Sequence, residues 1–167
     1  GMEEAERIVA EHDERNDFPN EILGEGSGLY GCNMAYRSSA IGSTRFDERL
    51  RLYGWQEDID FAAALMPRGK LVWTRSFTGV HLGVKHGRTP GLRLGYSQVV
   101  NPLYLAAKGT MSVGFALKLL VRNVLANHLK MFSPEPWVDR KGRVKGNWMG
   151  LFDAIRGRLT PERIEEL

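Results

Sequence analysis

Residues 54–74 read GWQEDIDFAAALMPRGKLVWT, and this stretch decides the fold class of the 167-residue chain. Its apolar residues recur at helical spacing up to Pro67, which predicts a helix over 56–66. The next segment, 71–74, is rich in branched and aromatic side chains and predicts a short strand. A helix followed directly by a strand indicates an α/β fold.

Further elements are expected on both sides of this stretch. The acidic segment 1–27 is interpreted as a partly helical or disordered lead-in, 28–108 as the α/β part, and 109–167 as an amphipathic helical extension. We expect strands over 29–36 and 77–82, a helical turn from Ser38 or Ser39, helices over 92–108 (broken or kinked near Pro102), 113–132 and 148–157, and a helix start at Thr160-Pro161. Residues 133–147 are expected to connect the last two long helices. The predicted fold is a few-stranded mixed sheet followed by helices.

Composition excludes several classes of protein. With 43% hydrophobic and 26% charged residues, the chain can bury a core and is not disordered by composition. It has no apolar run long enough to cross a bilayer, and its acidic start lacks a hydrophobic signal core. Its single cysteine, Cys32, excludes an intrachain disulfide, and zinc-finger spacing is absent. We therefore expect a cytoplasmic location.

The charge is distributed unevenly along the chain. Residues 1–26 hold nine acids and two bases, whereas residues 83–158 hold 13 bases and three acids. Such a basic segment attracts nucleotide phosphates or anionic lipid headgroups. The helix expected over 113–132 carries apolar residues on one face and bases on the other. It either packs on the core or lies on an anionic membrane surface at the inner face of the plasma membrane. Nucleic acid is not expected, because no known binding motif occurs.

Three carboxylates, Glu57, Asp58 and Asp60, fall at the start of the predicted helix. Acids are favoured in a first helical turn, and this explains Asp60 sufficiently. The preceding aromatic residues Tyr53 and Trp55 suit the faces of a sugar ring. A carboxylate beside them could take a proton from an attacking hydroxyl. A metal-binding role for the D-x-D pattern is rejected, because no hydrophobic strand precedes it.

The order of several short motifs resembles that of family 2 glycosyltransferases. The matching motifs are GCNMAYRS at 31–38, FDERL at 46–50, GWQEDID at 54–60, GKL at 69–71, VH at 80–81 and GR at 87–88. The likeness covers roughly residues 28–108. A later segment, 146–164, resembles the C-terminal tail of some bacterial members.

The resemblance implies a GT-A-like α/β fold and an inverting transfer of sugar from a nucleotide-sugar donor to a hydroxyl acceptor. It implies that Asp58 is the catalytic base. Glu57 would orient a carbohydrate or lipid-linked acceptor, Trp55 would pack against the acceptor ring, and Asn33 would line the acceptor cleft. The expected context is bacterial polysaccharide or glycolipid synthesis.

The resemblance also implies a divalent metal, Mn²⁺ or Mg²⁺, in the complete enzyme. His81 is the candidate metal ligand, because neutral imidazole suits Mn²⁺. Lys85 and Arg88, in a glycine-rich loop, are candidate phosphate ligands.

The part of a GT-A domain that binds the nucleotide has no counterpart here. Only about 28 residues precede the first matching motif. The chain is therefore expected to be the acceptor-side portion of a transferase, inactive and without bound metal on its own. A homo-oligomer through an exposed sheet edge is one way for it to fold. The alternative is a non-catalytic module that binds membranes or anions, or that oligomerises.

Overall fold

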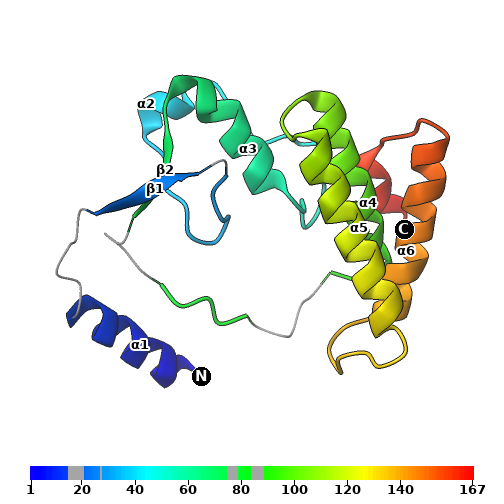
Figure 1. Ribbon diagram of the computed structural model, residues 1–167, viewed down its shortest axis with the longest axis horizontal. Helices are drawn as coiled ribbons and strands as arrows, with labels where there is room; N and C mark the ends of the chain where they lie inside the picture. Colours follow the sequence, from blue (N-terminus) through cyan, green and yellow to red (C-terminus); the bar gives the residue numbers. More distant parts are fainter. Residues whose placement is uncertain (15–20, 27, 75–78, 84–88) are drawn as a thin grey trace.

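The computed structural model describes residues 1–14, 21–26, 28–74, 79–83 and 89–167. This part is mixed α/β and mostly helical, with a sheet end and a helical end (Figure 1). The elements in chain order are α1 (Met2–Glu14), β1 (Ile22–Gly26), α2 (Ser38–Ile41), α3 (Glu57–Leu65), the 3₁₀ turn η1 (Met66–Arg68), β2 (Leu71–Thr74), α4 (Gly91–Lys108), α5 (Val113–Lys130), α6 (Arg140–Ile155) and the 3₁₀ turn η2 (Pro161–Glu166).

The sheet differs from the expected one. In the described residues it has two strands, β1 and β2, paired antiparallel from Ile22 opposite Thr74 to Gly26 opposite Leu71. The mixed sheet is therefore not found among the described residues, and the strand predicted over 29–36 is wrong. Of the strand predicted over 77–82, residues 77 and 78 lie outside the described residues, and 79–82 do not form a strand. The apolar residues of 29–36 pack instead against α3 and β2, in a cluster of Leu29, Ala62 and Leu71 with Met34 and Tyr36 beside it. These residues are apolar because they pack against α3 and β2, although they form no β-ladder.

The helices from α2 to α5 lie close to their predicted bounds. Helix α3 ends at η1, where Pro67 occupies the first turn. Helix α4 continues through Pro102, so the predicted break is wrong, and the fully buried ring of Pro102 packs within the bundle. Gly109 then ends α4 with a φ of 88°, a left-handed conformation that favours glycine. The Ser112 hydroxyl accepts from the amide of Phe115 and caps α5.

Helix α6 begins at Arg140, eight residues before its predicted start, because Asp139 caps it. The Asp139 carboxylate accepts from the Gly142 amide at 2.7 Å. The charged residues of 140–147, which belong to the predicted connection, are compatible with a helix, because other residues form its buried face. That face is formed by Gly146, Asn147, Gly150 and Asp153.

Helices α4 and α6 pack backbone against backbone. A Cβ atom on Gly95 would overlap the carbonyl oxygen of Arg143, and one on Gly146 would overlap that of Leu92. Asn127 of α5, expected on the polar face, is buried here instead. Its Nδ2 donates to Oε1 of Gln98 at 2.8 Å and to Oδ1 of Asn147 at 3.0 Å. This amide network joins α5 to α4 and α6.

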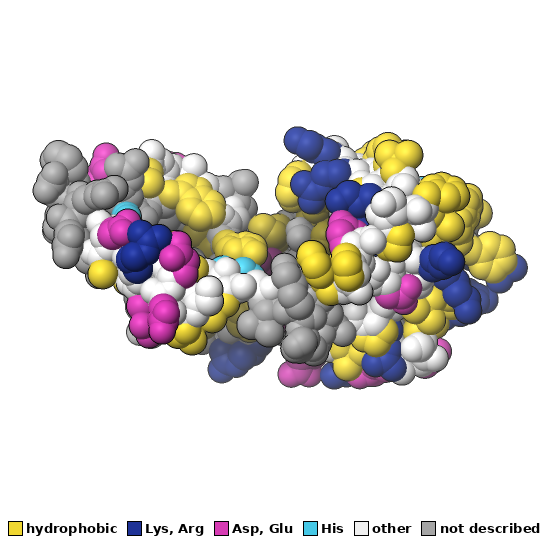
Figure 2. All heavy atoms as spheres, turned by 90° about the horizontal axis from the view of Figure 1, so that it is seen from below, with side chains coloured by type: hydrophobic (Ala, Val, Ile, Leu, Met, Phe, Trp, Pro, Cys, Tyr) yellow, Lys and Arg dark blue, Asp and Glu magenta, His cyan; other side chains and the backbone are white. Residues whose placement is uncertain are grey.

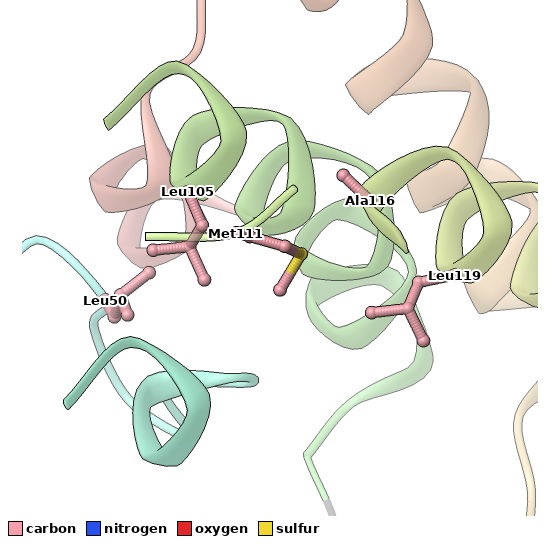
Figure 3. Packing of buried hydrophobic residues seen from close by; sticks show 5 residues of the cluster. All are labelled: Leu50, Leu105, Met111, Ala116 and Leu119. Carbon is pink, nitrogen blue, oxygen red and sulfur yellow. The ribbon is translucent and has the colours of Figure 1, made fainter. Parts of the chain in front are cut away.

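The main apolar cluster lies where the sheet end meets the helical end. It contains Leu50, Leu105, Met111, Ala116 and Leu119 (Figure 3). Leu50 comes from the loop before α3, whereas the others come from α4, α5 and the turn between them. The cluster therefore fixes the loop that leads to Trp55 against the helices.

Candidate functional site

A cavity of about 780 Å³ is lined by residues from both ends of the molecule. Its wall is formed by Cys32 and Asn33, by Tyr53 and Trp55, by the segment 79–83, and by residues around and within α4 and α6. Seen from below, where α1 lies in front of the sheet end, the surface is hollowed between this part and the helical end (Figure 2). Three predicted site residues, Asn33, Trp55 and His81, meet in this wall although they lie far apart in the sequence.

Trp55 enters the wall from a loop with an unusual backbone. Leu52, Gly54 and Gln56 have φ values of 58°, 56° and 77°, in the left-handed region that non-glycine residues rarely adopt. Asn101 of α4 holds this loop, since its Nδ2 donates to the carbonyl oxygen of Trp55 at 2.9 Å. Backbone strain of this kind persists only where the surroundings impose it, and it is often found at functional sites.

Asn33 is carried by a tight turn. Its amide donates to the carbonyl oxygen of Tyr30 at 2.8 Å. The turn is fastened to α3, because the amide of Gly31 donates to Oδ2 of Asp58 at 2.9 Å. The side chains of Cys32 and Asn33 are exposed and border the cavity.

Asp58, the predicted base, lies in the first turn of α3 and is hydrogen-bonded to this turn. Its Oδ1 accepts from the amide of Ile59 at 2.9 Å, while its Oδ2 accepts from Gly31. Neither Asp58 nor Glu57 belongs to the described cavity wall. In this geometry Asp58 positions the turn that carries Asn33.

Glu57, beside Asp58, lies over Gly54. A Cβ atom on Gly54 would overlap the carboxylate of Glu57, so the loop follows the side chain closely. Partial burial raises the pKa of Glu57, and the negative charge of Asp58 raises it further. The structure thus places a carboxyl group with increased proton affinity at the start of α3.

His81 borders the cavity next to an aromatic ring. It packs edge-on against Tyr30, with the ring centroids 6.2 Å apart. Among the residues that the structure describes, no group of three His, Cys, Asp or Glu side chains could hold a metal ion. The described surroundings of His81 therefore do not fit a divalent metal by themselves. The predicted phosphate ligands, Lys85 and Arg88, lie outside the described residues.

Sequence reasoning missed three polar residues of the wall, Thr89, Gln98 and Arg143. Gln98 comes from α4 and Arg143 from α6, a helix assigned to the C-terminal extension. The Gln98 side chain borders the cavity and is otherwise buried, with 7% of its surface exposed. The basic excess of residues 83–158 was the only sequence signal that pointed to Arg143. The helical extension is therefore part of the candidate site.

An ionic cluster fixes α3 relative to the helices. Lys108 Nζ lies 2.6 Å from Oδ2 of Asp47 and 2.7 Å from Oδ2 of Asp60. The hydroxyls of Tyr104 and Thr110 donate to the same two carboxylates at 2.7 and 2.6 Å. Asp60 lies in the first turn of α3, as predicted, and it is only 3% exposed because it packs against α4 and the turn after it.

The same cluster perturbs the acidity of its members. Burial raises the pKa of Asp47, but hydrogen bonds from Lys108 and Tyr104 outweigh it, so the pKa is lowered overall. The pKa of Lys108 is raised, because the two carboxylates outweigh the effect of burial. Both shifts keep the pair charged near neutral pH.

Comparison of the chain with protein-family models, with curated proteins and with solved structures gives no match. The likeness to family 2 glycosyltransferases rests on the motifs alone. Among the described residues, no helix has both the length and the apolarity needed to cross a membrane.

Proposed function

We propose that this chain is the acceptor-side portion of an inverting glycosyltransferase, which transfers a sugar from a nucleotide-sugar donor to a hydroxyl of a carbohydrate or lipid-linked acceptor. One observation supports it above the others. Asn33 and Trp55, assigned to the acceptor by the resemblance, and His81, the candidate metal ligand, line one cavity of about 780 Å³. That volume lies within the range of small-molecule sites, about 300–1,000 Å³.

The chemistry of the wall suits a sugar. Tyr53 and Trp55 offer aromatic faces to the apolar side of a pyranose ring, and Asn33 and Gln98 offer amides to its hydroxyls. The positive charge of Arg143 at the same wall suits an acceptor that carries an anionic group.

The residues at the start of α3 complete the proposal. Asp58 takes the proton of the acceptor hydroxyl, and Glu57 orients the acceptor through its carboxyl group. For Asp58 to act, the turn of residues 30–33 has to release the hydrogen bond from Gly31, so acceptor binding and turn movement are linked. The described residues supply no metal donor set, and we assign no metal step to this chain.

Binding of the acceptor can be tested on this chain directly. We expect glycosides to quench or shift the tryptophan fluorescence. Trp55→Ala should weaken binding about 2- to 12-fold, because the loss of an aromatic contact costs about 0.5–1.5 kcal/mol. Trp73→Ala is the matched control, because Trp73 is 45% exposed on β2 and does not border the cavity. Equal affinities of both variants would contradict the assigned acceptor site.

Catalysis is tested in the native polypeptide that contains this chain. We expect Asp58→Asn to lower sugar transfer by about 10²–10⁴-fold while the fold is kept, as for the loss of a general base. Glu57→Gln should raise the KM for the acceptor more than it lowers kcat. Unchanged transfer after Asp58→Asn would refute the base assignment.

A further inference from the structure

Two helices expose rows of large apolar side chains. On both helices the opposite side is the buried one, formed by residues such as Ala116 on α5 and Gly150 on α6. The exposed rows contain Leu117, Val121 and Leu125 on α5, and Trp148, Phe152 and Ile155 on α6. Ile155 is 85% exposed and Trp148 is 61% exposed. Apolar residues gathered in this way on a surface mark an interaction site.

The two helices that carry these rows are in contact. The rings of His128 and Trp148 meet edge-on with their centroids 5.8 Å apart, and Asn127 donates to Asn147 one residue earlier on each helix. We call the six exposed residues the α5–α6 apolar face. In the space-filling view from below, the helical end exposes apolar and basic side chains, with some acidic ones among them (Figure 2).

Exposed basic side chains lie on the same two helices as this face. Lys118 and Arg122 are exposed on α5, which lacks acidic residues, and Lys145 and Arg156 are exposed at α6. Arg156 lies over the ring of Phe152, 3.8 Å from its centroid, so cation and apolar surface are in direct contact.

The carboxylates of α6 and of the loop before it are engaged elsewhere. Asp153 is buried and accepts from the hydroxyl of Tyr96 at 2.9 Å, and Asp139 caps α6. Glu135 forms ion pairs with Lys130 and Arg140 at 2.9 and 2.7 Å. Residues 113–156, which form both helices and the loop between them, hold eight bases and three acids, so the helices that carry the α5–α6 apolar face have a net positive charge.

We propose that the α5–α6 apolar face docks on an anionic lipid bilayer. The apolar side chains enter the boundary between headgroups and acyl chains, while the flanking Lys and Arg side chains bind the anionic headgroups. A second copy of the chain fits less well, because packing this face on itself would bring like charges together. This docking does not depend on the proposed transfer reaction, since the cavity and the face are formed by different residues.

Vesicle flotation of the whole chain tests the proposal. Vesicles of phosphatidylcholine are compared with vesicles that also contain phosphatidylglycerol, at low and high salt. We expect binding to the anionic vesicles alone, with weaker binding at high salt. The pair Lys118→Gln and Arg122→Gln should lower the partition coefficient about 25-fold, from about fivefold for each base.

A second pair of substitutions tests the apolar part. Phe152→Ser with Ile155→Ser should abolish flotation and leave far-UV circular dichroism unchanged. Ile22→Ser with Leu23→Ser is the matched control, because these exposed apolar residues lie on β1, at the other end of the molecule. We expect this control to float like the wild type.

Several outcomes would overturn the proposal. One is the absence of flotation for the folded wild-type chain, and another is binding that is equal with and without phosphatidylglycerol. The third is a dimer in light scattering that dissociates after Phe152→Ser with Ile155→Ser while vesicles remain unbound. That result would assign the face to a second copy of the chain.

Discussion

Replacing Lys108 by Met tests whether its ion pairs hold α3 against the helices. The substitution keeps the length of the apolar stem and removes the charge that Asp47 and Asp60 share, at 2.6 and 2.7 Å. Breaking a buried ion pair costs about 3–5 kcal/mol. The Lys108 side chain is 32% exposed, so water screens part of this loss. We expect the free energy of unfolding to fall by about 2–4 kcal/mol, which lowers the Tm by roughly 5–12 °C.

Urea denaturation followed by circular dichroism at 222 nm measures this loss. Lys70→Met is the control, because Lys70 pairs with Glu25 on the surface, where both side chains are more than half exposed. Its effect should stay below about 0.5 kcal/mol. Equal losses in the two variants would refute the structural role of the cluster. So would simple additivity of Lys108→Met and Asp60→Asn in a double-mutant cycle.

The pH dependence of this loss has a defined sign. The pKa of Asp47 is lowered in the folded state, so its contribution is present above the ordinary pKa of an aspartate and disappears as the pH falls through the folded value. The difference between wild type and Lys108→Met should therefore shrink under acidic conditions, below about pH 4. A difference that stays constant into this range would contradict the assigned pKa shift.

Three further predictions concern the helices and the site. Gly146→Ala should destabilise the fold by about 1–3 kcal/mol through overpacking against α4, whereas Gly114→Ala, with open space at its Cβ, should leave stability unchanged or raise it, as thermal unfolding will show. Ser112→Ala should cost about 1 kcal/mol in urea denaturation, because it removes the cap of α5. In an NMR titration Glu57 should titrate above the ordinary range for glutamate, and Asp58→Asn should lower its pKa.

Local patterns were sufficient to predict much of the secondary structure. The apolar spacing before Pro67 predicted α3, and the branched residues that follow predicted β2. The strand predicted over 29–36 failed because its residues are apolar for a different reason: they cover α3 and β2. A strand also needs a partner strand, and pairing depends on residues far apart in the chain.

The candidate site was predictable only in part. Its loops carry recognisable residues, and Asn33, Trp55 and His81 were chosen from them. Arg143 could not be found in this way, because its position depends on the backbone contact between α4 and α6 at Gly95. The contact of Asp58 with the turn of residues 30–33 could not be predicted either, because it depends on a hydrogen bond from Gly31, which lies far from Asp58 in the sequence.

The buried amide network has a consequence for what the cavity can recognise. Oε1 of Gln98 accepts from Asn127, which is itself bonded to Asn147. This bond uses one of the two lone pairs of the oxygen and fixes the orientation of the amide in the wall of the cavity. A ligand therefore meets Gln98 in one orientation that is set before binding. Because the side chain is already ordered, binding loses less conformational entropy at this position than it would at a mobile glutamine.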